Sequence, residues 1–139
     1  MDALFKKKII HRDLKFENIL ISHDKVAKIT DFGLSKDMGN MSNVSSRRCG
    51  TPYTMAPEIF FNHDSRAFYS QKCDIWSLGV ILHEIIYNKH PFNYSSERAA
   101  KMQRVNVTKT NGHLDMLIDR CLIKNPHNRI EWDEFKTIY

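Results

Sequence analysis

Long apolar runs are absent from this sequence of 139 residues. The longest apolar stretch, residues 75–87, is interrupted by Ser77, His83 and Glu84, so it falls short of the roughly 20 apolar residues of a transmembrane helix. The first ten residues contain three lysines and lack the apolar core of about 7–15 residues that a secretory signal requires. We therefore expect a soluble protein without a membrane span, in the cytoplasm or, as the alternative, in the nucleus.

Cysteine is scarce, and the three cysteines, Cys49, Cys73 and Cys121, lie far apart in the sequence. No C-x-x-C pair occurs, so the sequence supports neither a disulfide framework nor a zinc site. The stretch that begins with His83-Glu84 also lacks the second histidine of a zinc-binding helix.

No dense block of one charge is present either. The sequence has 21 Lys and Arg against 16 Asp and Glu, a net charge of +5, and the basic residues are dispersed apart from Lys6–Lys8 and Arg47-Arg48. Dispersed charge is typical of a solvated surface, so we expect no nucleic-acid partner. With 42% hydrophobic and 11% aromatic residues, the chain is suited to one packed domain and not to disorder.

Apolar periodicity predicts a mainly α fold with a small β-hairpin. The β-branched runs 19–21 and 26–29 flank a short polar stretch and predict the hairpin. Residues 33–50 are polar, and we expect a long exposed loop there. Residues 73–88 carry apolar side chains on nearly every face, which predicts a helix buried all round. Further helical patterns cover residues 2–8, 56–61, 114–122 and 132–138.

Six short motifs follow one another along the chain. They are His11-Arg12-Asp13-Leu14-Lys15-Phe16-Glu17-Asn18, Asp31-Phe32-Gly33, Gly50-Thr51-Pro52-Tyr53, Ala56-Pro57-Glu58, Asp74-Ile75-Trp76-Ser77-Leu78-Gly79 and Arg129. In order and spacing they resemble the motifs of eukaryotic protein kinases over essentially the whole chain. Lys15 and Gly50-Thr51-Pro52 resemble the serine/threonine type. The stretches DFGLSK (31–36), CGTPYTMAPEI (49–59) and NRIEWDEF (128–135) resemble calcium/calmodulin-dependent or ULK-type kinases.

The resemblance implies a chemical role for four residues. Asp13 would orient a substrate hydroxyl and accept its proton, and Lys15 would offset negative charge on the transferred phosphoryl group. Asn18 and Asp31 would supply oxygen ligands to Mg²⁺, so ATP and Mg²⁺ are the implied cofactors. The alternative is that Asp13, Asn18 and Asp31 are ordinary turn or capping residues and that Lys15 is a solvated charge.

The resemblance also implies structural roles around residues 31–33. His11 is expected to pack against Phe32 and to hydrogen-bond toward Asp31. Gly33 is expected to provide the unusual backbone angles of the turn.

Three more residues match positions that stabilise the fold in the family. Glu58 and Arg129 are expected to form a buried ion pair, for which the planar fork of arginine is suited. Asp74 is expected to anchor the backbone of residues 11–18.

A protein substrate with a serine or threonine acceptor is implied. Thr51 is expected to contact Asp13 and Lys15 and to help select the hydroxyl. Glu17 and Glu84 match positions that contact basic residues in the substrates of arginine-directed kinases. Both are also common in the family for structural reasons, so the two interpretations stay open.

Arg12 matches an arginine that commonly forms an ion pair with a phosphorylated residue of the activation segment. The position two before Cys49, often threonine in related kinases, is Arg47 here. Ser45 and Ser46 are the nearest substitutes for phosphorylation by an upstream activating kinase. The alternative is that both serines are exposed polar residues of a loop.

The resemblance implies that residues 1–139 form a partial kinase domain. It comprises a catalytic loop at 11–18, a magnesium-binding triplet at 31–33, an activation segment at 31–58 and a helical subdomain at 59–139. The sequence contains no G-x-G-x-x-G and no lysine strand with a partner glutamate. We therefore expect the large C-terminal lobe with the β-rich N-terminal lobe absent, inactive by itself. The alternative is a non-catalytic truncated lobe that acts as a protein-interaction module.

Overall fold

The computed structural model describes residues 1–92, 104–109 and 112–138. The helices are α1 (Asp2–Lys6), α2 (Pro57–Phe60), α3 (Gln71–Tyr87), α4 (Gly112–Cys121) and α5 (Trp132–Ile138), with short 3₁₀ turns η1 (Phe16–Asn18) and η2 (Pro52–Thr54). The strands are β1 (Ile9–Ile10), β2 (Ile19–Ile21), β3 (Ala27–Ile29), β4 (Lys36–Asp37), β5 (Val44–Arg47) and β6 (Arg66–Tyr69). All strands pair antiparallel, β1 with β4, β2 with β3 and β5 with β6.

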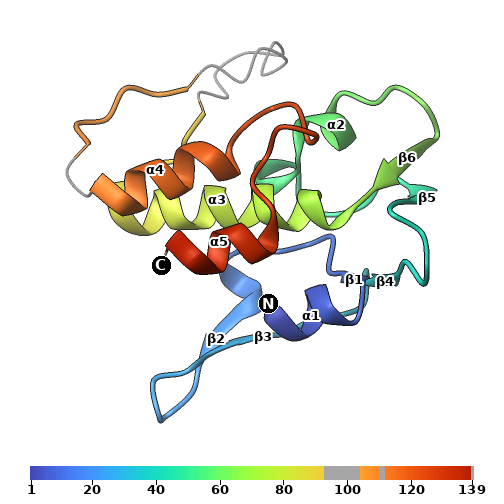
Figure 1. Ribbon diagram of the computed structural model, residues 1–139, viewed down its shortest axis with the longest axis horizontal. Helices are drawn as coiled ribbons and strands as arrows, with labels where there is room; N and C mark the ends of the chain where they lie inside the picture. The colour runs from blue at the N-terminus through green and yellow to red at the C-terminus, as the bar shows by residue number, and fades with distance from the viewer. Residues whose placement is uncertain (93–103, 110–111, 139) are drawn as a thin grey trace.

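Helix α3 runs through the middle of the molecule and supplies much of its core (Figure 1). The Ser70 side chain caps its first turn by accepting the backbone N–H of Lys72, and Asn88 ends it in the left-handed conformation with a φ of 48°. From residue 73 to 81 all but one residue is buried. Ile85 is 61% exposed, so the prediction of a helix buried all round is wrong for the last turn, where no described element covers this side chain.

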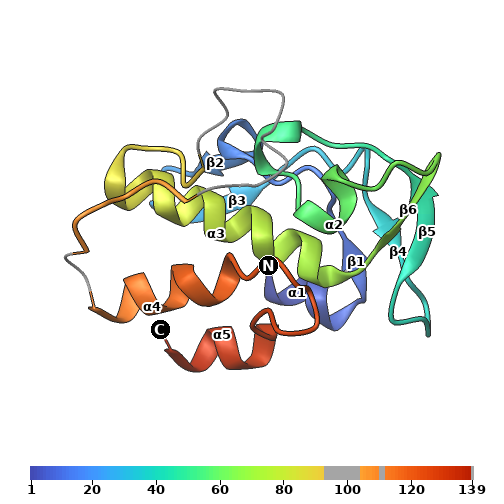
Figure 2. The same cartoon turned by 90° about the horizontal axis from the view of Figure 1, so that it is seen from above.

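Helix α4 lies on one side of α3, and the β2–β3 hairpin lies on the opposite side (Figures 1 and 2). Leu117, Ile118 and Cys121 of α4 are buried, as the amphipathic pattern predicts. The two helices approach closely at Gly79, where a Cβ would lie only 2.5 Å from the Cβ of Cys121. A side chain at this position would therefore push α4 away from α3.

Helix α5 packs against α1 and so brings residues near both ends of the chain together. The ring of Trp132 stacks on Phe5 with centroids 4.7 Å apart and on Phe135 at 5.0 Å. The indole N–H of Trp132 donates to Asp2 at 3.1 Å. The helical pattern expected over residues 132–138 is thus confirmed, and its apolar side chains form a half-buried helix face.

Strands β2 and β3 form the predicted hairpin. Ile19 pairs with Ile29 and Ile21 pairs with Ala27. Lys25 takes a φ of 59° in the turn, and its N–H donates to the Ser22 carbonyl at 2.8 Å. The register fixes which residues meet at the base of the hairpin.

The segment 33–50 is not the long exposed loop that its polar composition predicts. It contains β4 and β5, and Met38 and Val44 within it are buried, with 5% and 3% exposure. In the partner strand β6, residues 66 and 68 are exposed while 67 and 69 are buried, the alternation of a strand with one covered face. The prediction failed because β5 and β6 are distant in the chain, and β5 alone carries a single large apolar residue.

The expected fold class therefore understates the β content, since the described residues form three two-stranded sheets and not one hairpin. The helices still supply more of the buried core side chains than the strands do. Among the described helices, none is both long enough and apolar enough to cross a lipid bilayer.

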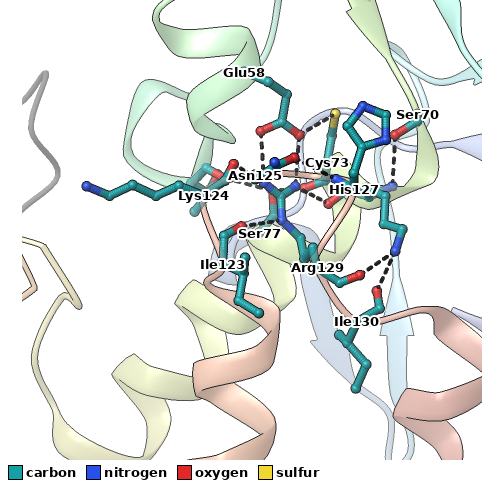
Figure 3. Close-up of polar contacts among 12 residues, drawn as sticks. Glu58, Ser70, Cys73, Ser77, Ile123, Lys124, Asn125, His127, Arg129 and Ile130 are labelled. Atoms are coloured by element: carbon teal, nitrogen blue, oxygen red, sulfur yellow. Dashed lines mark hydrogen bonds and ion pairs between the residues drawn. The ribbon is translucent and has the colours of Figure 1, made fainter.

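Glu58 and Arg129 meet as the resemblance implies, and they join α2 to the segment between α4 and α5 (Figure 3). Both guanidinium Nη atoms bond to the carboxylate oxygens at 2.8 Å, and the Arg129 side chain has no exposed surface. The remaining guanidinium donors bond to the backbone carbonyls of Ile123, Lys72 and Lys124. A buried charge with all its hydrogen bonds made is tolerated, whereas the same site with one partner removed is not.

We expect Arg129→Ala to lower the free energy of unfolding by about 3–5 kcal/mol, because the half-buried Glu58 carboxylate and three backbone carbonyls lose their hydrogen-bond donor. Urea unfolding followed by circular dichroism measures this loss. Arg120→Ala is the matched control, since Arg120 pairs with Glu134 at the surface and should cost no more than about 1 kcal/mol. An Arg129→Ala protein as stable as the control would contradict a structural role for the pair.

Candidate active site

The loop of residues 11–18 is held in place by a buried carboxylate of α3. Asp74 accepts the backbone N–H of His11 at 2.7 Å and that of Arg12 at 3.0 Å. Burial raises the pKa of Asp74 to about 6, although the two backbone hydrogen bonds act in the opposite direction. The anchored Arg12 has a φ of 71°, a left-handed conformation that residues other than glycine seldom adopt.

Asp13 is the centre of a cluster of polar groups on this loop. Its Oδ1 accepts the backbone N–H of Thr51 at 2.8 Å and the Thr51 hydroxyl at 2.7 Å. Its Oδ2 lies 2.9 Å from Nζ of Lys15, which also donates to the Thr51 hydroxyl at 3.0 Å. The predicted contacts of Thr51 with Asp13 and Lys15 are thus present.

The charges of this cluster are fixed by their mutual contacts. Burial raises the pKa of Asp13, but hydrogen bonds from Thr51 and Lys15 outweigh burial and leave the pKa below its usual value. The hydrogen bond to Asp13 in turn raises the pKa of Lys15. At neutral pH the structure therefore presents an aspartate anion beside a lysine cation.

Gly50 allows the segment that carries Thr51 to approach the loop. Its φ is 103°, and a Cβ at this position would lie 2.3 Å from the carbonyl oxygen of Arg12. Both the backbone angle and the space require glycine. The contact between Thr51 and Asp13 depends on this approach.

Asn18 and Asp31 lie at the same end of the β2–β3 hairpin. The register places Asn18 opposite Thr30, whose N–H donates to the Asn18 carbonyl at 2.9 Å. The Asn18 side-chain amide donates to the backbone carbonyl of Asp13 at 2.8 Å and to its carboxylate at 3.3 Å, which leaves the amide oxygen available as a ligand. Asp31 follows Thr30 with an exposed side chain.

These two side chains offer Mg²⁺ the ligand type that it prefers. An amide oxygen and a carboxylate are hard donors, and Mg²⁺ commonly takes one or two protein oxygens together with waters and phosphates. Within the described residues no group of three or more His, Cys, Asp or Glu side chains forms a self-sufficient cation site. The donor set at Asn18 and Asp31 therefore fits a cation that arrives with a phosphate ligand.

The surroundings of Asp31 differ from the predictions in two respects. The ring of His11 meets Phe32 edge-on at 5.0 Å as expected, but its Nε2 bonds to the carbonyl of Thr30 at 3.0 Å and not to Asp31. The positive φ of the turn, 60°, belongs to Asp31 itself, so the expectation for Gly33 is wrong. Asp31 tolerates this angle because its carboxylate accepts the N–H of Gly33 at 3.2 Å.

The side chain of Arg12 reaches across to the segment that follows Asp31. Its Nε donates to the Leu34 carbonyl at 2.5 Å and its Nη1 to the Ser46 hydroxyl at 2.7 Å, while the guanidinium lies 5.2 Å from the centre of the Tyr69 ring. The structure therefore brings Ser46 to Arg12. Ser45 belongs to the other face of β5 and makes no contact with this arginine among the described residues.

Glu17 and Glu84 come from η1 and α3, and their charges act on each other. The pKa of Glu84 is raised, first by burial and then by the charge of Glu17, while the neighbouring His90 acts in the opposite direction. Glu17 is exposed and Glu84 is half-buried. Glu17 and Glu84 are near enough for their charges to interact, and together they form a small acidic area between η1 and α3.

Two positioning residues were missed by the sequence reasoning. The Gln71 side-chain amide donates to the carbonyls of Leu4 at 3.1 Å and Phe5 at 3.2 Å, which ties α1 to α3. The Tyr69 hydroxyl accepts the backbone N–H of Cys49 at 2.9 Å and so fixes the residue before Gly50. Neither belongs to a motif, and their partners are distant in the chain, so no sequence pattern indicated their roles.

Comparison with known proteins assigns a family to this arrangement. A family model described as protein kinase domain matches residues 1–138. The chain belongs to the protein kinase domain family. This kinase domain is 44% identical to serine/threonine-protein kinase 33 of Bos taurus over 68% of its own length and 21% of that relative. It is 37% identical to serine/threonine-protein kinase STE20 of Kluyveromyces lactis and 34% identical to serine/threonine-protein kinase PAK 4 of Homo sapiens, each over 93% of its own length.

The relatives confirm the resemblance to serine/threonine protein kinases. The kinase domain spans 13% of the STE20 kinase and 22% of the PAK 4 kinase, so it corresponds to a small part of each. The names of these three relatives mention neither calcium/calmodulin nor ULK, and that finer assignment stays a prediction.

Asp74→Asn should change how stability depends on pH, because it removes the titrating carboxylate. A folded-state pKa of about 6, above the ordinary 3.8, means that the folded protein binds this proton more tightly than the unfolded chain. The stability of the wild type relative to Asp74→Asn should therefore fall as pH rises from about 4 to about 6, by roughly 3 kcal/mol in total.

Urea unfolding of both proteins at several pH values between 4 and 7 measures this dependence. Asp133→Asn is the matched control, since Asp133 is 93% exposed in its side chain and should show no such change. A constant difference between wild type and Asp74→Asn across the range would contradict the raised pKa.

Proposed function

We propose that the kinase domain takes part in transfer of the γ-phosphoryl group of ATP to a serine or threonine hydroxyl of a protein substrate. The observation that carries this proposal is the cluster of Asp13, Lys15 and Thr51, with Asn18 bonded to it. It combines a proton acceptor, a cation and one oxygen ligand for a metal within one hydrogen-bonded group. Phosphoryl transfer needs all three at one place.

Each residue of the cluster has a role that follows from its chemistry. Asp13, ionised and held by Thr51, would accept the proton of the acceptor hydroxyl. Lys15 would stabilise negative charge on the transferred group. Asn18 and Asp31 would hold Mg²⁺, and Mg²⁺·ATP, when bound, supplies the phosphoryl group. The Thr51 hydroxyl is hydrogen-bonded to both charged residues and would hold the side chains of Asp13 and Lys15 in place.

We also propose the finer division of the domain. The catalytic loop would comprise residues 11–18, the magnesium-binding triplet 31–33, the activation segment 31–58 and the helical subdomain 59–139, together the large lobe of a kinase domain. An apolar groove of about 390 Å³ beside the hairpin supports this placement, because a second lobe packed there would bury it. Its lining includes Leu14, Ile19, Ile29, Phe32 and Ile81.

The test is Mg²⁺-dependent transfer of radiolabelled phosphate from ATP to a basic protein by the 139-residue chain. We expect the chain by itself to show at most a trace of transfer, because active kinases use a lysine–glutamate ion pair and a glycine-rich loop that these residues do not include. Asp13→Ala should lower it further, by about 10²–10⁴-fold, the range for loss of a general base. Transfer that persists unchanged in Asp13→Ala would refute the role of this aspartate.

Two additions make this experiment decisive. Asp24→Ala, which removes an exposed carboxylate from the turn of the hairpin, should leave transfer at the wild-type level. Mg²⁺-dependent binding of ATP, measured by calorimetry, should weaken about tenfold or more in Asp31→Asn, because the carboxylate holds the cation. A folded chain without transfer and without nucleotide binding would favour the alternative, a protein-interaction module.

We propose that the acidic area of Glu17 and Glu84 selects substrates with basic residues near the acceptor. Binding of the chain to an array of peptides that differ only in arginine placement tests this directly. We expect arginine-bearing peptides to bind about 5–10-fold more tightly, and Glu17→Gln with Glu84→Gln to remove the difference, since each charge-assisted hydrogen bond is worth about 1.5–3 kcal/mol before screening. Equal binding of all peptides by the wild type would refute the preference.

We propose, in addition, that an upstream kinase phosphorylates Ser46 of the activation segment and that Arg12 then binds the phosphate. The support is the hydrogen bond between the Arg12 guanidinium and the Ser46 hydroxyl. A phosphate at this position would add acceptor oxygens to a contact that the unmodified chain already makes.

A further inference from the structure

The outward face of the β5–β6 sheet carries two arginines directly opposite each other. The register pairs Arg47 with Arg66, and both side chains are exposed. In the part of the chain that the structure describes, neither guanidinium forms an ion pair with a carboxylate. Like charges directly opposite in an antiparallel pair destabilise it. An anion bound between the two guanidinium groups replaces this repulsion with two attractions.

Phe68 adds an apolar surface to the same face. Side chains alternate along β6, so Phe68 and Arg66 point outward, whereas Ala67 and Tyr69 are buried. The Phe68 ring is 65% exposed and lies opposite Ser45, whose small side chain leaves it uncovered. One exposed ring alone is common on protein surfaces, so its surroundings decide whether it marks a contact.

A groove of about 710 Å³ opens beside this face. It lies between the β4–β5 turn, the beginning of α3 and the segment before α5, and its lining includes Phe68, Met38 and Met41. Met38 is buried, whereas Met41 is 61% exposed. Because Phe68 belongs both to the sheet and to the groove, the arginine pair and the groove form one continuous surface.

The carboxylates that line the groove are neutralised from within the chain. Glu58 pairs with Arg129, and Glu131 pairs with Lys72 at 2.6 Å. Lys8 also lines the groove, is exposed, and forms no ion pair with any residue that the structure describes. The uncompensated charge around the groove is therefore positive, and it comes from Lys8 and the arginine pair.

The composition of this surface favours a protein segment over a nucleic acid as the occupant. Aromatic residues, methionine and arginine are enriched where proteins bind one another, and here all three are exposed together. A flexible methionine such as Met41 adapts to apolar side chains of different shapes. A single-stranded nucleic acid needs cations along a track of successive phosphates, whereas the basic residues of this chain are dispersed.

We propose that Arg47, Arg66 and Phe68 form a docking site for an acidic segment of a partner protein. Carboxylates of the segment bridge the two guanidinium groups, and an apolar side chain next to them enters the groove against Phe68 and Met41. The β5–β6 sheet lies at one end of the molecule, and the β2–β3 hairpin lies toward the other (Figures 1 and 2). The site attracts acidic partners, whereas the area of Glu17 and Glu84 attracts basic ones, so the inference goes beyond the proposed function.

Fluorescence polarisation with the 139-residue chain tests the proposal. The probe is a labelled peptide in which glutamates flank one leucine. Two further peptides carry lysines in place of the glutamates or serine in place of the leucine. We expect the glutamate–leucine peptide to bind about tenfold more tightly than either, because each replacement removes one of the two recognised features. Equal binding of the three peptides by the wild type would overturn the proposal.

Single substitutions locate the site on the surface. Arg47→Gln and Arg66→Gln should each weaken binding of the glutamate–leucine peptide about 5–10-fold. Phe68→Ala should weaken binding of that peptide but not of the peptide with serine. Arg48→Gln is the matched control, because this neighbouring arginine donates to the Phe60 carbonyl and its loss should change binding less than about twofold at physiological salt. A loss in Arg48→Gln as large as that in Arg66→Gln would reveal unspecific attraction and overturn the proposal.

Thermal unfolding provides a second readout that needs no label. Without peptide, Arg66→Gln removes a repulsion and should raise the melting temperature slightly, by about 2 °C. With the glutamate–leucine peptide in excess, the wild type should gain more than Arg66→Gln, because a tighter ligand stabilises the folded state more. Equal gains in both proteins, or tighter binding of a single-stranded oligonucleotide of matched charge, would overturn the proposal. Neither measurement contains ATP, so failure here is distinct from failure of the phosphoryl-transfer assay.

Discussion

The arrangement of the site depends on one buried carboxylate. Asp74 belongs to α3, the helix around which the other elements pack, and it accepts two consecutive backbone N–H groups of the loop 11–18. A loop of eight residues has little core of its own, so its shape must be imposed by a rigid neighbour. The carboxylate does this by binding the backbone, which leaves the side chains of His11, Arg12 and Asp13 free to reach in three directions.

Those three directions connect the loop to three distant parts of the chain. His11 contacts the end of the hairpin at Thr30, Arg12 contacts β5 at Ser46, and Asp13 contacts Thr51. The groups proposed for metal binding, for regulation and for proton transfer are therefore positioned from adjacent residues. A disturbance of the backbone at this point would move all of them together, whereas a disturbance in α4 or α5 would reach them only through α3.

Sequence reasoning found the parts of this structure whose signal is local. Asp13 and Asn18 belong to a compact motif, and the apolar periodicity of α3 and α4 is strong enough to predict both helices. It missed the β5–β6 sheet, because a strand with Val44 as its only large apolar residue shows a covered face only beside its partner. It also assigned the positive φ to Gly33, although the carboxylate of Asp31 stabilises that conformation through its own turn.

The β2–β3 hairpin has a consequence for the candidate metal site. Asn18 and Asp31 are separated by a turn whose tip contacts neither of them, but they are held together by the ladder at the base. The distance between the two oxygen donors is therefore independent of the length of the intervening chain. Extra residues at the tip would leave the ligand geometry as it is, whereas a slip of one residue in the ladder would turn alternate side chains to the opposite face and separate the pair.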